Sequence, residues 1–124
     1  MTTILLVDDE KAFVLSLADG LQAYFRNINV LTAENGKKAL ELLDSREINM
    51  VITDLKMPVM DGFELIENVN KHLPAIPVVV MTAFNDAAAG LRLMNMGISQ
   101  IIDKPLDFHA VIAIVERIVN AGGL

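Results

Sequence analysis

The sequence contains no cysteine. This absence excludes disulfide scaffolds, thiolate zinc sites and cysteine nucleophiles, and it is compatible with a reducing compartment. The first residues lead directly into an apolar run and then into acids, without the basic start and small-residue cleavage site of a secretory signal. No apolar run approaches the roughly 20 residues that a membrane-spanning helix needs. We therefore expect a soluble, cytoplasmic protein that makes no membrane contact.

A concentration of basic residues is also missing. The chain carries ten Lys and Arg against sixteen Asp and Glu, for a net charge of −6 at pH 7, and Lys37 and Lys38 are the only adjacent basic pair. Nucleic-acid binding requires a clustered basic face that neutralises phosphates. We therefore expect no direct contact between this chain and nucleic acid.

The chain has 124 residues, of which 53% are hydrophobic and 21% are charged. That composition is typical of a compact globular protein, and the length suits one domain with its own core. We expect a single domain over residues 1–124, without internal repeats. Two contexts stay open, a stand-alone protein and one domain of a longer protein.

Five short, β-branched apolar runs recur along the chain at roughly even spacing. They lack a clean alternation of apolar and polar residues, which indicates strands covered on both faces, as in a parallel sheet flanked by helices. Five stretches with helical apolar spacing lie between and after them, and Asp107 and Gly97 are a predicted helix start and helix stop. The predicted fold is α/β, a doubly wound (βα)5 parallel sheet. The predicted strands are residues 4–7, 28–32, 50–53, 77–81 and 99–102.

Polar residues follow four of these five runs. Ligands of an open parallel sheet bind beyond the carboxyl ends of its strands, so three aspartates, a hydroxyl and a lysine are expected to converge there. Taken singly, each has a plainer explanation, such as a helix-start charge, a turn residue or a solvated lysine. Their placement at successive strand ends favours a shared site. The candidates are Asp8, Asp9, Asp54, Thr82 and Lys104.

Clustered carboxylates repel one another unless a cation lies among them. Magnesium suits such a site because it binds oxygen ligands, keeps several waters and leaves room for a phosphate oxygen. Asp54 is the candidate nucleophile, since a carboxylate can accept a phosphoryl group. The Lys104 ammonium and the Thr82 hydroxyl would then stabilise the charge on the transferred group.

The same residues resemble the response regulator receiver family over nearly the whole chain. The resemblance lies in Asp8-Asp9, Asp54 within D-L-K-M-P-V-M-D-G, Thr82-Ala83 and Lys104-Pro105. It implies a flavodoxin-like sheet with strand order 2-1-3-4-5, and phosphorylation of Asp54 by a sensor histidine kinase or a small phosphodonor. It also implies a regulatory phosphoacceptor that promotes its own phosphorylation and dephosphorylation, rather than an enzyme.

The resemblance further implies a role for each site residue. Magnesium or manganese would be bound directly by Asp9 and Asp54, through water by Asp8, and by the backbone carbonyl of Lys56. Lys104 would contact the phosphoryl group, and its bond to Pro105 would be cis. Thr82 would move toward the phosphate and draw the following loop with it.

One position departs from the family pattern. Members often couple the moving hydroxyl to a Tyr or Phe three residues before the lysine, and this chain has Ile101 there. An aliphatic residue has no ring whose rotation could transmit the movement of the Thr82 hydroxyl. A binding-only receiver that is never phosphorylated is therefore one alternative function. A magnesium phosphohydrolase resembling the haloacid dehalogenases is a second, less favoured because those carry D-x-D where this chain has Asp8-Asp9, and because no cap region is present.

The predicted fourth helix, residues 87–96, carries few polar residues. Only Arg92 and Asn95 are strongly polar, whereas a surface helix normally has a polar face. One explanation is a helix better buried than usual. The favoured one is a contact surface, together with the fifth strand region, for a dimer mate, an output domain or an effector protein.

Overall fold

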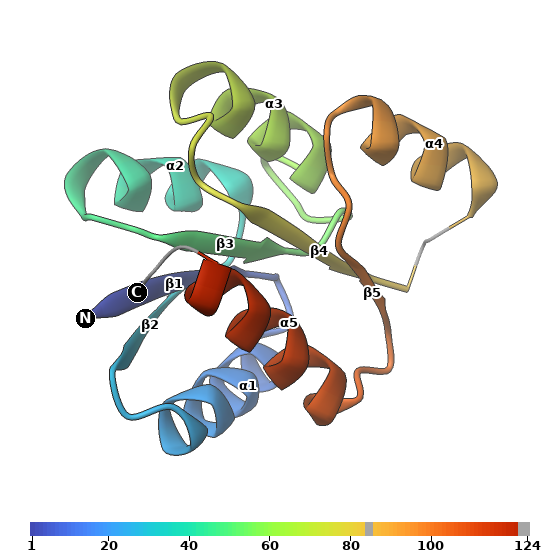
Figure 1. Cartoon of the computed structure of the whole chain (residues 1–124). Coiled ribbons are helices and arrows are strands. Elements are labelled where there is room, and N and C mark those ends of the chain that lie inside the picture. The colour runs from blue at the N-terminus through green and yellow to red at the C-terminus, as the bar shows by residue number, and fades with distance from the viewer. Residues whose placement is uncertain (84–85, 122–124) are drawn as a thin grey trace.

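The computed structural model describes residues 1–83 and 86–121. Within them, five strands form one parallel sheet in the order β2-β1-β3-β4-β5, and a helix follows each strand (Figure 1). This confirms the predicted α/β class and strand order. The elements are β1 (Thr2–Val7), α1 (Lys11–Tyr24), β2 (Ile28–Ala33), α2 (Gly36–Ser45), β3 (Met50–Thr53), α3 (Gly62–His72), β4 (Val78–Thr82), α4 (Ala87–Asn95), β5 (Ile101–Asp103) and α5 (Phe108–Ala121).

The sheet is covered on both faces. Helices α1 and α5 lie on one side, and α2, α3 and α4 lie on the other (Figure 1). The central strand β3 is therefore buried along its length, and in β1 the run Ile4–Val7 is fully excluded from solvent. Burial on both faces is the physical reason that these strands read as continuous apolar runs.

Strand boundaries differ from the sequence prediction by one or two residues at every strand except β3. Strand β4 begins at Val78 rather than at Pro77, because proline has no N–H to donate to the ladder, although its carbonyl still accepts from Val51. Both β4 and β5 continue one residue further than predicted, so that Thr82 pairs with Asp103. The sheet therefore extends up to the predicted site residues.

Local capping explains where most helices begin. The side chains of Asn35, Asp61 and Asp86 accept the hydrogen bonds that cap α2, α3 and α4. The predicted start and stop are confirmed, since Asp107 accepts a hydrogen bond from the N–H of His109, and Gly97 has a φ of +83° after α4. Helix α1 is different, because the residue before it is Glu10, whose side chain makes no capping hydrogen bond.

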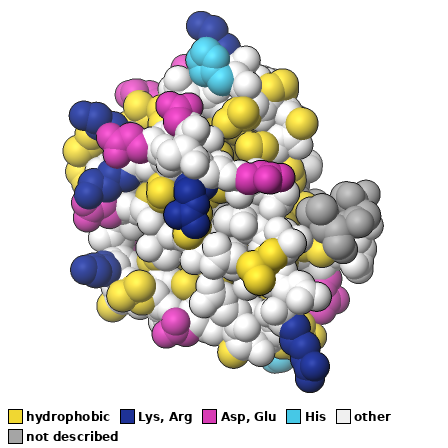
Figure 2. All heavy atoms as spheres, turned by 90° about the vertical axis from the view of Figure 1, so that its left-hand side faces the viewer, with side chains coloured by type: hydrophobic (Ala, Val, Ile, Leu, Met, Phe, Trp, Pro, Cys, Tyr) yellow, Lys and Arg dark blue, Asp and Glu magenta, His cyan; other side chains and the backbone are white. Residues whose placement is uncertain are grey.

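Two features of the structure are relevant to the predictions that the chain contacts neither nucleic acid nor a membrane. On the face drawn in Figure 2, lysines and arginines are interspersed with acids rather than gathered into one basic patch. Among residues 1–83 and 86–121, no helix is both long enough and apolar enough to cross a membrane.

Candidate functional site

Strand pairing brings the first two carboxylates together. Val7 lies opposite Thr53 in the β1·β3 ladder, and the N–H of Asp54 donates to the Val7 carbonyl at 2.9 Å. Asp8 and Asp54 therefore leave neighbouring strands at the same edge of the sheet. Both side chains are nearly excluded from solvent, with exposed fractions of 0% and 8%.

Lys104 bridges these two carboxylates. Its Nζ lies 2.6 Å from Asp8 Oδ2 and 2.9 Å from Asp54 Oδ2, and its side chain is only 12% exposed. Two buried carboxylates at this separation would repel strongly without a cation between them. The lysine ammonium supplies that positive charge in this structure, and the predicted meeting of Asp8, Asp54 and Lys104 is confirmed.

Backbone groups fix the second oxygen of each carboxylate. Asp8 Oδ1 accepts from the N–H of Glu10 at 3.0 Å, and Asp54 Oδ1 accepts from the N–H of Leu55 at 2.7 Å. In both residues, the remaining oxygen is the one that faces Lys104. The two carboxylates are thus held in defined orientations before any ligand arrives.

A close backbone approach positions Asp54. The N–H of Gly62 donates to the Leu55 carbonyl at 2.7 Å, which draws the start of α3 against the end of β3. A Cβ at residue 62 would lie 2.1 Å from the Asp54 carbonyl oxygen. Only glycine allows this contact, so the D-G pair at Asp61 and Gly62 shapes the loop that carries the candidate nucleophile.

The charges in the site perturb two pKa values. Burial alone would lower the pKa of Lys104, but hydrogen bonds to Asp8 and Asp54 and the attraction of their charges outweigh it and raise that pKa. Burial also raises the pKa of Asp9, and the negative charges of Asp8 and Asp54 add to this effect against the lowering by a backbone hydrogen bond. Asp9 therefore lies within electrostatic reach of the cluster.

The donor set fits a hard divalent cation. Carboxylate oxygens of Asp8, Glu10 and Asp54 all lie within 4.8 Å of one another, and oxygen is the donor that magnesium and manganese prefer. Asp9 is not part of this trio among the described residues, and Lys56 is exposed next to the site. The ligand roles of Asp9 and of the Lys56 carbonyl stay predictions.

Glu10 is the contact that the sequence prediction missed. Its Oε1 lies 3.3 Å from Lys104 Nζ, which makes it the third acid around the ammonium. The only sequence signal was its place in the acidic run after β1.

Thr82 also lies beside the site. It is buried at the end of β4, and its carbonyl accepts a hydrogen bond from the N–H of Lys104 at 2.9 Å. The predicted cis bond between Lys104 and Pro105 is also confirmed.

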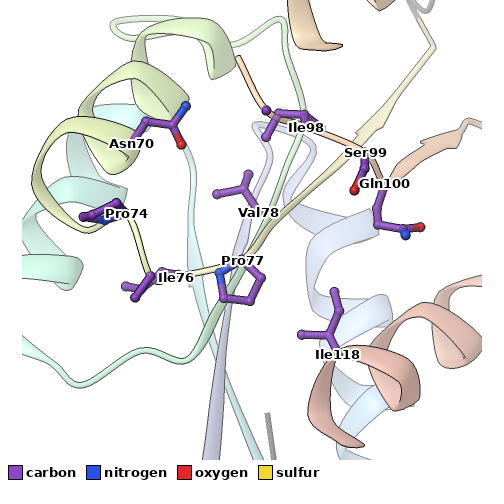
Figure 3. A pocket seen from close by; sticks show the side chains of 11 residues that line it. Asn70, Pro74, Ile76, Pro77, Val78, Ile98, Ser99, Gln100 and Ile118 are labelled. Atoms are coloured by element: carbon purple, nitrogen blue, oxygen red, sulfur yellow. The ribbon is translucent and has the colours of Figure 1, made fainter. Parts of the chain in front are cut away.

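Two hollows of the surface lie at opposite edges of the sheet. One, of about 340 Å³, reaches Asp8 and is lined by Lys11 and Lys38. Another, of about 320 Å³, is lined by Pro77 and Val78 at the start of β4 and by side chains that precede β5 (Figure 3). Because the strands are parallel, this second hollow lies at the edge opposite the carboxylates and takes no part in the site.

Helix α4 presents apolar side chains to solvent. Leu91 and Met94 are 59% and 68% exposed, and within α4 Leu93 alone is buried. The explanation that this helix is better buried than usual is therefore wrong. Ile101 packs beneath α4, in an apolar cluster that includes Val80 and Leu93.

Comparison with known proteins gives the family. The response regulator receiver domain model matches residues 4–116. Among curated proteins, the chain is 34% identical over 116 residues to the transcriptional regulatory protein ZraR of Escherichia coli O157:H7, covering 92% of this chain and 25% of that protein. It is 32% identical over 114 residues to the DNA-binding transcriptional regulator NtrC of Escherichia coli K12, covering 92% of this chain and 24% of that protein. The chain spans about a quarter of the length of these relatives.

Solved structures agree with this match. The non-phosphorylated HemR receiver domain from Leptospira biflexa is 27% identical with a TM-score of 0.86, and covers 96% of this chain and 94% of its own. The signal receiver domain of an HD domain-containing protein from Pseudomonas fluorescens Pf-5 is 26% identical with a TM-score of 0.88, and covers 97% and 95%. With the family model matching most of the sequence, this chain belongs to the response regulator receiver domain family of two-component signal transduction.

Proposed function

We propose that this receiver is a phosphorylation switch in which Asp54 accepts a phosphoryl group from a sensor histidine kinase. The observation that carries the proposal is the arrangement around Asp54. Its carboxylate is nearly buried, one oxygen is held by the Leu55 N–H, and the Lys104 ammonium lies 2.9 Å from the other. A carboxylate fixed beside a partly buried ammonium is prepared for a reaction that brings further negative charge to it.

The proposed reaction is a phosphoryl transfer from nitrogen to oxygen. A carboxylate oxygen of Asp54 forms a bond to phosphorus while the P–N bond of the donor phosphohistidine breaks, and the imidazole keeps that electron pair and takes up a proton. Charge spreads over the phosphoryl oxygens during transfer. Lys104 is close enough to neutralise part of it, and Thr82, at the end of β4, offers a hydroxyl on the neighbouring strand.

We further propose that the acidic residues hold magnesium or manganese during this reaction. Asp8, Asp9 and Asp54, with the Lys56 carbonyl, would bind the ion, and the convergence of the Asp8, Glu10 and Asp54 oxygens supports this. When bound, the ion would supply positive charge for the phosphoryl oxygens. The same residues would serve the hydrolysis of the acyl phosphate, so that the domain would promote its own dephosphorylation.

Helix α4 is the proposed output surface. Its exposed Leu91 and Met94 are suited to contact a dimer mate, an output domain or an effector protein, and Ile101 lies beneath the helix on β5. Because Ile101 has no ring, we propose that movement of Thr82 reaches α4 through packing in this cluster. The relatives ZraR and NtrC are transcriptional regulators about four times as long, which is consistent with an output domain as partner.

A binding-only receiver is the second candidate function. Ile101 at the usual aromatic position is the observation that favours it. The contacts of Lys104 with Asp8 and Asp54 argue against it, because a module that never accepts a phosphoryl group has no need for a partly buried lysine between two buried acids.

Intact mass measurement tests the proposal. The protein is incubated with acetyl phosphate or phosphoramidate, with magnesium or with EDTA, beside the Asp54→Asn variant. We expect one added phosphoryl group that requires magnesium and is absent from the variant. If the wild-type protein gains no adduct, and beryllofluoride also fails to stabilise it against thermal unfolding, the binding-only function is the better description.

A further inference from the structure

The third acid at Lys104, Glu10, occupies an unusual position. It is the residue that precedes α1, where serine, threonine, aspartate and asparagine are favoured because their short side chains cap the helix. The Glu10 side chain makes no capping bond. It is instead 67% exposed and places Oε1 3.3 Å from Lys104 Nζ. The position therefore gives up a helix cap and gains a contact with the lysine.

Lys104 has two kinds of partner in this structure. Asp8 and Asp54 are buried, and each directs at the ammonium the one oxygen that no backbone N–H holds. Glu10 and the ring of Phe13, whose centroid lies 4.7 Å from Nζ, approach from α1 and its N-terminus. Asp8 and Asp54 are proposed ligands of the cation, whereas Phe13 is not. Glu10 has an oxygen within 4.8 Å of theirs but is not one of the proposed ligands.

A divalent cation bound by the buried pair must change this arrangement. It would compete with the ammonium for the same oxygens, and two positive charges at such short range repel each other. Lys104 then needs another partner if it is to remain at the site. Among the described residues, Glu10 is the remaining acid in contact with it, and an exposed side chain can follow the ammonium as it moves.

We propose that Glu10 is a positioning residue that retains the Lys104 ammonium when a divalent cation takes Asp8 and Asp54. This inference rests on the proposed function, because it concerns the metal-loaded state that precedes phosphoryl transfer. Glu10 and the Phe13 ring then hold the lysine beside the reacting group. The arriving phosphoryl oxygens, which carry more charge, draw Lys104 away from Glu10.

NMR of the lysine side chains tests this directly. The chain has six lysines, and the Lys104 ammonium signal is assigned as the one lost in the Lys104→Arg variant. Its exchange with water is measured at low temperature without divalent cation, with saturating magnesium, and with magnesium plus beryllofluoride. The variant is Glu10→Gln, and the control is Glu47→Gln, which removes the same charge from an exposed position before β3.

With saturating magnesium, we expect the Lys104 ammonium to exchange about two- to fivefold faster in Glu10→Gln than in the wild-type protein, the range typical for a partly exposed ion pair. Glu47→Gln should match the wild type, and beryllofluoride should restore slow exchange in all three proteins. Equal exchange in magnesium-loaded wild type and Glu10→Gln, with beryllofluoride still acting, would overturn the role of Glu10 alone. Failure of beryllofluoride to change Lys104 in the wild type would instead count against the proposed function.

Discussion

At the scale of single residues, the site is a balance of charge around one lysine. Three acids contact Lys104, and hydrogen bonds to the two buried ones raise its pKa although burial opposes this. The lysine contribution to stability is therefore complete below its usual pKa of 10.5 and is lost only as pH rises toward the higher folded-state value. Across the physiological range, the ammonium stays charged and keeps Asp8 and Asp54 together.

The ionised Asp9 carboxylate has the opposite effect on stability. Its pKa is raised in the folded protein, mainly by burial, so the folded state binds a proton there more tightly than the unfolded chain does. The ionised carboxylate therefore lowers stability above the folded-state pKa, and this cost disappears below the unfolded value of 3.8. We expect Asp9→Asn to stabilise the metal-free protein at pH 7 by less than about 1 kcal/mol, because the group is largely exposed.

Urea unfolding in EDTA at pH 7 and near pH 3 measures this effect. The gain from Asp9→Asn should be present at the higher pH and absent at the lower one. A variant that is less stable than the wild type at pH 7 would contradict the conclusion that the ionised Asp9 carboxylate lowers stability.

At the scale of elements, the junction between β3 and α3 determines where the candidate nucleophile lies. We expect Gly62→Ala to cost about 3 kcal/mol or more of unfolding free energy, because its Cβ would meet the Asp54 carbonyl at 2.1 Å and the backbone there must shift. The shift should also impair phosphorylation by acetyl phosphate. Both effects are measured by thermal unfolding and by the mass assay.

Gly97→Ala is the matched control for that substitution. Its Cβ would meet nothing within 4 Å, so its cost comes only from the positive φ of +83° and should be about 1 to 2 kcal/mol. Phosphorylation should be unchanged in this variant. Equal losses of stability and of phosphorylation in the two variants would contradict the claim that Gly62 positions Asp54.

The elements themselves follow closely from the sequence pattern. Strand β3 is predicted at its observed bounds, since Met50, Val51 and Ile52 are apolar and all four of its residues are buried. Strand β5 was predicted to begin two residues early, at Ser99, because its short apolar run carries no proline or glycine at that boundary. The position of Glu10 relative to Lys104 was not predictable, because it depends on where α1 begins and on side-chain direction. The spacing of residues along the sequence specifies neither the first residue of α1 nor the direction of the Glu10 side chain.

At the scale of the whole molecule, the parallel sheet gathers the acids at one edge. Such an edge should bind divalent cations more strongly in the folded protein than in the unfolded chain, which stabilises the fold by mass action. At a magnesium concentration of one hundred times Kd, the expected gain is about 2.7 kcal/mol. Thermal unfolding with magnesium chloride, against sodium chloride at equal ionic strength, measures it. Identical melting temperatures in the two salts would show that the acidic edge does not bind the ion.

Chemical mapping of the phosphorylated residue is the direct test of Asp54 as the phosphoryl acceptor. Borohydride reduces an acyl phosphate to an alcohol and releases phosphate, so a phosphorylated aspartate becomes homoserine while free carboxylates do not react. The protein is treated with acetyl phosphate and magnesium, reduced, digested and sequenced by mass spectrometry. We expect homoserine at position 54 and at no other acid. Modification at Asp8, Asp9 or Glu10 instead, or at no residue, would contradict the proposal that Asp54 accepts the phosphoryl group.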